Sequence, residues 1–108
     1  METKVTVRKE GFAEFTLKGN VAIVTFAPEP LTEGYCLASQ LSVKLNRKMS
    51  YDEVVARLIH ARYTSDGEVA LINNALSDIA NIADNAEYAE YQRWRNKCKE
   101  TAKNYLGL

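Results

Sequence analysis

The spacing of the apolar residues changes near residue 50, and this change restricts the possible folds more than any other feature. Before it, apolar and polar residues mostly alternate, as around Val5 and Val7. A period of two indicates half-buried strands. After it, apolar residues recur every three or four positions, which is typical of helices that bury one face. We therefore expect an α+β protein, with strands first and helices second.

Three strands are expected in the N-terminal part. The first two alternate over residues 4–8 and 14–18, and the third, 21–26, is apolar on both faces, which suits a central strand. Gly19-Asn20 signals a tight turn before the third strand. Pro28-Glu29-Pro30 should end it, because proline cannot donate to a strand ladder. Short connections predict a three-stranded antiparallel meander.

Segment 35–45 fits two interpretations. Leucines recur in it every four residues, as on a helix, but its alternate positions are also apolar, as in a strand. Two boundary residues favour the helix, because Thr32 can cap its start and Asn46 suits its end. We therefore expect a helix here and leave the strand open.

Two or three further helices are expected, which makes three or four in all. Ser50-Tyr51-Asp52-Glu53 is a capping box, and Ser65-Asp66-Gly67-Glu68 repeats the pattern. The apolar stripe of the second of these helices comprises Val69, Ile72, Leu76, Ile79 and Ala80. A break is expected near Asp84-Asn85, followed by a last helix from about Ala86 to Leu106 that ends at Gly107.

The composition is that of one globular domain. The chain has 108 residues, of which 46% are hydrophobic and 26% charged. We expect a single domain, 1–108, with a strand-rich part at 1–30 and a helical part at 31–108. Cys36 and Cys98 are expected to be reduced thiols, because secreted domains that depend on disulfides usually carry more cysteines. Without a signal-like N-terminus or a long apolar run, the expected location is the cytoplasm and no membrane partner is expected.

An enzyme is not expected. His60 is the only histidine, and nearby Arg57 and Arg62 make it a poor general base. A boundary histidine, half covered by its neighbours, is the favoured interpretation. One histidine and two distant cysteines give no zinc-ligand pair, and the few glycines form no phosphate loop. We expect no metal site and no cofactor.

Nucleic-acid binding would need a local basic patch, because 14 basic residues balance 14 acidic ones. One patch, in the turn before residue 50, has the position of a helix-turn-helix turn: Lys44, Arg47 and Lys48. Asp52 and Glu53 at the start of the following helix would repel phosphates there.

The other basic patch lies late in the last helix: Arg93, Arg95, Lys97, Lys99 and Lys103. With Trp94 among them, these residues could bind a single strand. The favoured interpretation is a solvated face, because acidic residues early and basic residues late match the helix dipole.

The last helix also carries many aromatic residues. We expect one helix side to be too narrow to bury Tyr88, Tyr91, Trp94 and Tyr105 together, so that some aromatic surface remains for a partner. The predicted docking residues are three aromatic anchors and three orienting cations: Tyr88, Trp94, Tyr105, Arg93, Arg95 and Lys99.

Charges divide into two bands along the helical part. Every charged residue from Asp66 to Glu90 is acidic, and from Arg93 to Lys103 nearly all are basic. Two chains could pair these bands as a homodimer, although pairing within one chain explains the same pattern. Both alternatives stay open.

Two segments resemble small uncharacterised proteins of Bacteroides-type gut bacteria and their prophages. The first segment is Tyr51–Thr64, which includes Ile59-His60-Ala61-Arg62-Tyr63-Thr64. The second is Glu90–Glu100, and Ala102 supplies the alanine that follows it in those proteins. The resemblance covers about the C-terminal 60 residues. Some of those proteins are encoded near phage tail genes, so the resemblance implies a phage or prophage accessory or tail-assembly role. It assigns a role to no residue.

The expected function is therefore non-enzymatic protein–protein interaction through the last helix. The alternative is a small nucleic-acid-binding regulator that uses the basic residues of the same helix.

Overall fold

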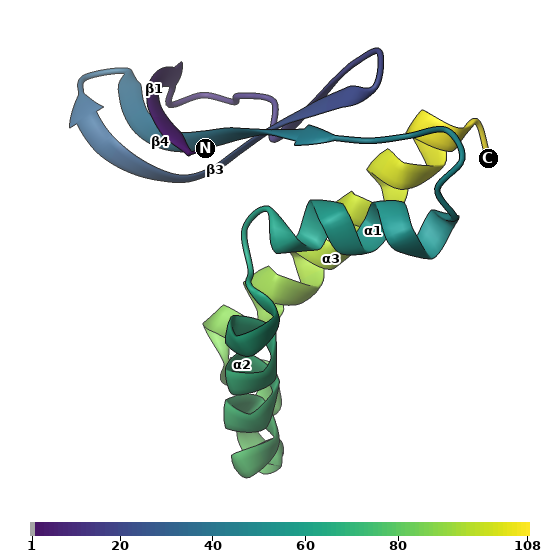
Figure 1. Ribbon diagram of the computed structural model, residues 1–108. Helices are drawn as coiled ribbons and strands as arrows, with labels where there is room; N and C mark the ends of the chain where they lie inside the picture. Colours follow the sequence, from purple (N-terminus) through teal and green to yellow (C-terminus); the bar gives the residue numbers. More distant parts are fainter. Residues whose placement is uncertain (1) are drawn as a thin grey trace. The chain divides into compact units, whose positions relative to one another are not determined.

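The computed structural model describes residues 2–108 and has an α+β fold (Figure 1). The chain divides into two compact units, with the boundary between Met49 and Ser50. The first unit is a sheet and the second is helical. The predicted order of strands and helices is confirmed, but the strand-rich part continues to Lys44 instead of ending at residue 30.

The sheet unit has four antiparallel strands in the order β1-β4-β3-β2. The strands are β1 (Thr3–Arg8), β2 (Phe15–Lys18), β3 (Val21–Thr32) and β4 (Tyr35–Lys44). The turn at Gly19-Asn20 joins β2 to β3, where Lys18 pairs with Val21, and β3 is a central strand, as predicted. The predicted three-stranded meander is wrong in one respect, because β1 pairs with β4 and not with β2.

Strand β4 replaces the helix that the sequence predicts over 35–45. It is hydrogen-bonded on both sides, to β1 and to β3, and it buries Cys36 and Ala38 on one face. Thr32 is the last residue of β3, so it caps no helix, and Gly34 (φ 81°) forms the turn into β4. Pairing with two neighbouring strands outweighs the weak local preference for a helix.

Strand β3 does not end at Pro28-Glu29-Pro30. It continues to Thr32, with shifts of register between Phe26 and Glu29 and again before Thr32. The positive φ of Ala27 (50°) marks the first irregularity. Such a bulge leaves residues out of the ladder, and this is where a strand accepts proline.

The helical unit contains α1 (Tyr51–His60), α2 (Ser65–Ser77), a short 3-10 helix η1 (Ile79–Asp84) and α3 (Ala86–Leu106). Ser50 caps α1 as predicted, accepting a hydrogen bond from the Glu53 N–H at 3.2 Å. The cap of α2 is Thr64, whose Oγ1 accepts from the Gly67 N–H at 3.0 Å, so the predicted cap at Ser65 is one residue late.

The predicted break before the last helix is confirmed. Asn85 caps α3 by accepting from the Tyr88 N–H at 3.0 Å. Gly107 ends α3 with a left-handed φ of 73°, as its position predicts.

Helices α1 and α3 provide the buried face of the helical unit, and the two helices pack on each other. The buried residues of α1 are Val54, Val55, Leu58 and Ile59. Those of α3 are Tyr91, Trp94, Cys98, Thr101, Ala102 and Tyr105. Their spacing of three or four residues places them on one helix side. Both cysteines, Cys36 and Cys98, are buried thiols.

Candidate functional site

The exposed side of α2 and η1 is the most unusual surface of the helical unit. Val69, Leu76 and Ile79 are 58%, 56% and 67% exposed, and half-buried Ile72 lies beside them. These four residues belong to the apolar stripe that is expected to pack, but three of them are exposed. We call Val69, Ile72, Leu76 and Ile79 the α2 face.

The α2 face is exposed because α2 rests on α3 through a different side. Its one buried residue is the small Ala75, and Leu71 is half-buried. Residues 71 and 75 are one turn apart and share a helix side, whereas Val69 and Leu76 lie on another. Figure 1 shows α2 running beside the first turns of α3. The apolar sector of α2 is therefore wider than its contact, and part of it faces solvent.

The charged residues between Asp66 and Glu90 are all acidic, whereas the Arg95 and Lys99 cations of α3 line the same depression as Ile72. Of the six between residues 66 and 90, two are paired: Glu68 with His60, and Glu90 with Arg62 and Arg93. The other four form no ion pair with any of residues 2–108: Asp66, Asp78, Asp84 and Glu87. Two of these carboxylates, Asp66 and Asp78, thus adjoin the exposed apolar stripe, whereas Glu87 lines a depression with Leu71 on another side of α2.

A polar network fixes the start of α2 to α1 and α3. His60 Nε2 lies 2.7 Å from Glu68 Oε1, and the Tyr91 hydroxyl donates to Glu68 Oε2. Burial, and next the hydrogen bond to Glu68, raise the pKa of Tyr91 to about 12. Tyr63 packs edge-on against Tyr91, with ring centroids 5.0 Å apart.

The partner of His60 is not the one that the sequence suggests. A half-covered histidine near arginines is expected, and the side chain is indeed 43% exposed, but its partner is Glu68. The two are eight positions apart, and only the turn between α1 and α2 brings them together. The one sequence signal for this pair was the acidic residue at position 68, because a carboxylate in the first turn of α2 lies near the end of the preceding helix.

A shallow depression of about 380 Å³ opens beside this network. Its lining includes apolar Val55, Ile59 and Ile72, and the cations of Arg95 and Lys99. The Arg95 guanidinium lies over the Tyr91 ring, 5.8 Å from its centroid, and its Nε is buried with no hydrogen-bond partner among residues 2–108. The lining contains no serine, threonine or cysteine.

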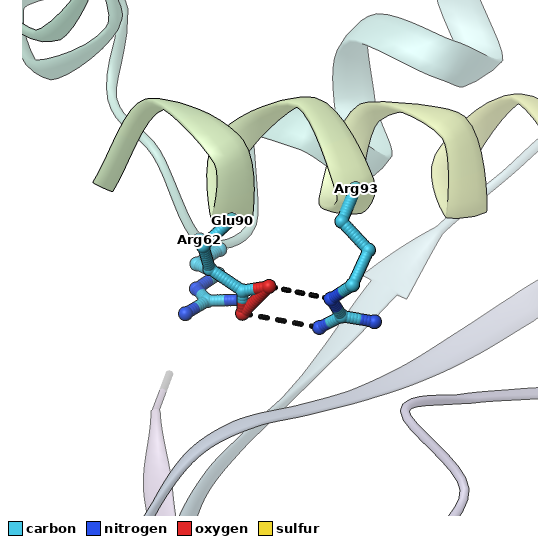
Figure 2. Close-up of polar contacts among 3 residues, drawn as sticks. All are labelled: Arg62, Glu90 and Arg93. Atoms are coloured by element: carbon cyan, nitrogen blue, oxygen red, sulfur yellow. Dashed lines mark hydrogen bonds and ion pairs between the residues drawn. The ribbon is translucent and has the colours of Figure 1, made fainter. Parts of the chain in front are cut away.

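A second ionic cluster uses one of the predicted orienting cations within the protein (Figure 2). Glu90 accepts two hydrogen bonds from Arg93, at 2.5 Å from Nε and 3.1 Å from Nη2, and one from Arg62 Nη1 at 3.3 Å. The hydrogen bond from Arg93 is the main cause that holds the pKa of Glu90 below its usual range. Arg62 also lies over the Trp94 ring, 4.8 Å from its centroid.

Two of the three predicted aromatic anchors are core residues. Trp94 is 0% and Tyr105 is 2% exposed, and Tyr88 is half-buried. One side of the last helix buries three of its four aromatic residues, and only half-buried Tyr88 leaves the aromatic surface that the sequence predicts. The spacings of Tyr88, Tyr91, Trp94 and Tyr105 are three residues or sums of three and four, so they follow one another along one side of the helix and do not occupy the same level of it.

The orienting cations have different surroundings. Arg93 binds Glu90, Arg95 is half-buried over Tyr91, and Lys99 is exposed. The basic patch also lacks the exposed tryptophan on which a base could stack. The helix-turn-helix alternative at Lys44 is wrong, because the residues before that turn form β4.

Among residues 2–108, no three His, Cys, Asp or Glu side chains lie together as metal ligands would. Over the same residues, no helix combines the length and the apolar composition that a membrane span requires. Comparisons with protein-family models, curated proteins and solved structures find no match.

Proposed function

We propose that this protein acts by non-enzymatic protein–protein interaction and that the α2 face is its docking surface. The observation that carries the proposal is the exposure of Val69 and Leu76 on one side of α2, and of Ile79 at the start of the following η1. Burying a side chain of this size stabilises a complex by about 1.5–3 kcal/mol. Because these side chains are exposed in the folded chain, a partner that covers them would gain this stabilisation. Single exposed apolar residues are ordinary on proteins, whereas a stripe of them indicates an interaction site.

This proposal moves the docking surface from the last helix to α2. The earlier anchors Trp94 and Tyr105 cannot meet a partner without leaving the core, and Arg93 is already held by Glu90. A phage or prophage accessory or tail-assembly factor, the role implied by the resemblance of the helical segments, would act through such a docking surface. The cytoplasm stays the proposed compartment.

The alternative of a nucleic-acid-binding regulator has weaker support. Exposed Lys97, Lys99 and Lys103 remain on α3, but no exposed aromatic residue accompanies them. Their attraction for phosphates would be purely electrostatic, and the chain as a whole carries no net charge.

Site-specific photo-crosslinking tests the proposal. A photoreactive phenylalanine analogue replaces Leu76 in cells that naturally carry the chain, and the matched control carries it at Leu31, an equally exposed leucine (49%) of the sheet unit. We expect a discrete crosslinked protein from position 76 and none from position 31. The same pattern of products from both positions, or no product from position 76, would overturn the proposal.

A further inference from the structure

We infer that the partner of the α2 face is a basic amphipathic helix, with an apolar stripe flanked by lysine or arginine. The inference rests on the proposed function, because it names the chemistry of the partner at that same surface. It follows from what surrounds the apolar stripe.

The surroundings of the stripe require positive charge. Asp66 lies in the first turn of α2 near Val69, Asp78 lies between Leu76 and Ile79, and two further carboxylates follow. None of these four carboxylates forms an ion pair within residues 2–108; Asp78 accepts a hydrogen bond from Asn81, and the Arg95 and Lys99 cations lie beside Ile72 only. A partner that covers the stripe brings its own flanking side chains near them, so cations attract and carboxylates repel.

The shape of the stripe favours a helix as the partner. From residue 69 to residue 76 the α-helical rise spans about 10 Å, or two turns, and Ile79 follows at the start of η1. A convex helical ridge of this length is matched by another helix that crosses it with apolar residues at three- and four-residue spacing.

A second copy of this chain fits poorly. In a two-fold dimer the α2 faces would meet each other, so the uncompensated carboxylates of one chain would face those of the other. The exposed cations of α3 offer no complement, because no large exposed apolar side chain lies on that helix. The exposed Leu31 of the sheet unit lies between two acidic residues in the sequence, Glu29 and Glu33.

Phosphate-bearing surfaces fit no better. Membranes with anionic headgroups and nucleic acids both carry negative charge, and both would be repelled by the carboxylates around Val69 and Leu76. A protein helix with cationic flanks can cover the apolar stripe and also place positive charge near the carboxylates beside it.

Three synthetic peptides of about 18 residues, long enough to reach useful helicity, test the inference. The first carries leucines at helical stripe spacing flanked by lysines. The second replaces the lysines with glutamates, and the third keeps the composition of the first but disperses its leucines around the helix. Binding to the full chain is measured by fluorescence anisotropy at about 50 and about 300 mM salt, where screening differs strongly.

We expect the lysine-flanked peptide to bind at least about tenfold more tightly than either control, and more weakly at high salt. Val69→Ser with Leu76→Ser should abolish its binding, and Leu31→Ser should not change it. Asp66→Asn with Asp84→Asn should weaken binding and flatten its salt dependence. These residues are exposed, so circular dichroism should show that all variants fold.

Two results would overturn the inference in different ways. If the glutamate-flanked peptide binds as well as the lysine-flanked one, and Leu76→Ser still abolishes binding, the face docks a helix but its charge does not choose the partner. The proposed function then stands and the inference fails. If light scattering shows a dimer that tightens with salt and dissociates with Leu76→Ser, the occupant is a second copy.

Discussion

His60 Nε2 and Glu68 Oε1 lie 2.7 Å apart and join the last residue of α1 to the first turn of α2. The other oxygen of the same carboxylate accepts a hydrogen bond from Tyr91 of α3. One side chain therefore holds all three helices of the unit, and the position of the α2 face depends on it.

Replacing Tyr91 with phenylalanine should destabilise the helical unit by about 1 kcal/mol. The change removes only the hydroxyl that donates to Glu68, and a net hydrogen bond contributes free energy of that order. Urea denaturation of the two proteins measures the difference. Tyr88→Phe is the matched control, because Tyr88 lies one turn earlier on α3, and it should change the free energy of unfolding by less. Equal effects of the two substitutions would contradict a specific role of the network.

The stability of the protein should fall at alkaline pH as Tyr91 ionises. Its pKa is raised from 10.0 to about 12 in the folded chain, so the folded state holds this proton more tightly than the unfolded state. The stabilisation is complete below pH 10 and is lost as the pH rises toward 12. Near-ultraviolet absorbance should show a late-titrating tyrosinate that Tyr91→Phe removes. A titration curve unchanged by that substitution would contradict the assignment.

At acid pH, Glu90 should give the opposite dependence. Its pKa is lowered in the folded chain, chiefly by the hydrogen bond from Arg93. The stabilisation is therefore present above the ordinary carboxyl pKa of 4.5 and is lost as the pH falls through the lower folded value. Because Glu90 is partly exposed, the effect should be small. Glu90→Gln should flatten the acid limb of a thermal-unfolding profile, and an unaltered limb would refute the prediction.

Trp94→Ala should destabilise the protein by about 3–5 kcal/mol, because it empties a fully buried site. Chemical denaturation measures this loss. Val69→Ser is the comparison, since an exposed substitution usually changes the free energy of unfolding by less than about 0.5 kcal/mol. If the Trp94→Ala protein were as stable as the original, Trp94 would not be a core residue.

Local signals in the sequence predicted most of the helical unit. Capping side chains and a C-terminal glycine act within one turn, so the starts of α1 and α3 and the end of α3 follow from a few residues. Strand β4 could not be found in this way, because its conformation is decided by two partner strands far along the chain. Without these two partner strands, the leucines of segment 35–45, which recur every four residues, would suit a helix equally well.

The candidate site was harder to predict than the fold. Periodicity shows that Val69 and Leu76 share a side of α2, but it does not show how much of that side the neighbouring helix covers. The small Ala75 sets the contact with α3 and leaves the larger residues outside it. The aromatic residues of α3 failed as anchors for the same reason, since spacing alone cannot distinguish a buried stripe from an exposed one.

The position of β1 has a consequence for the order of assembly during synthesis. Strands β2, β3 and β4 are neighbours both in the chain and in the sheet, so each can pair as soon as the next one leaves the ribosome. Val5 pairs with Ala38, so the first strand made must wait for the last strand of the sheet. Strand β1 is thus the first strand of the sheet to be synthesised and the last to be paired in it.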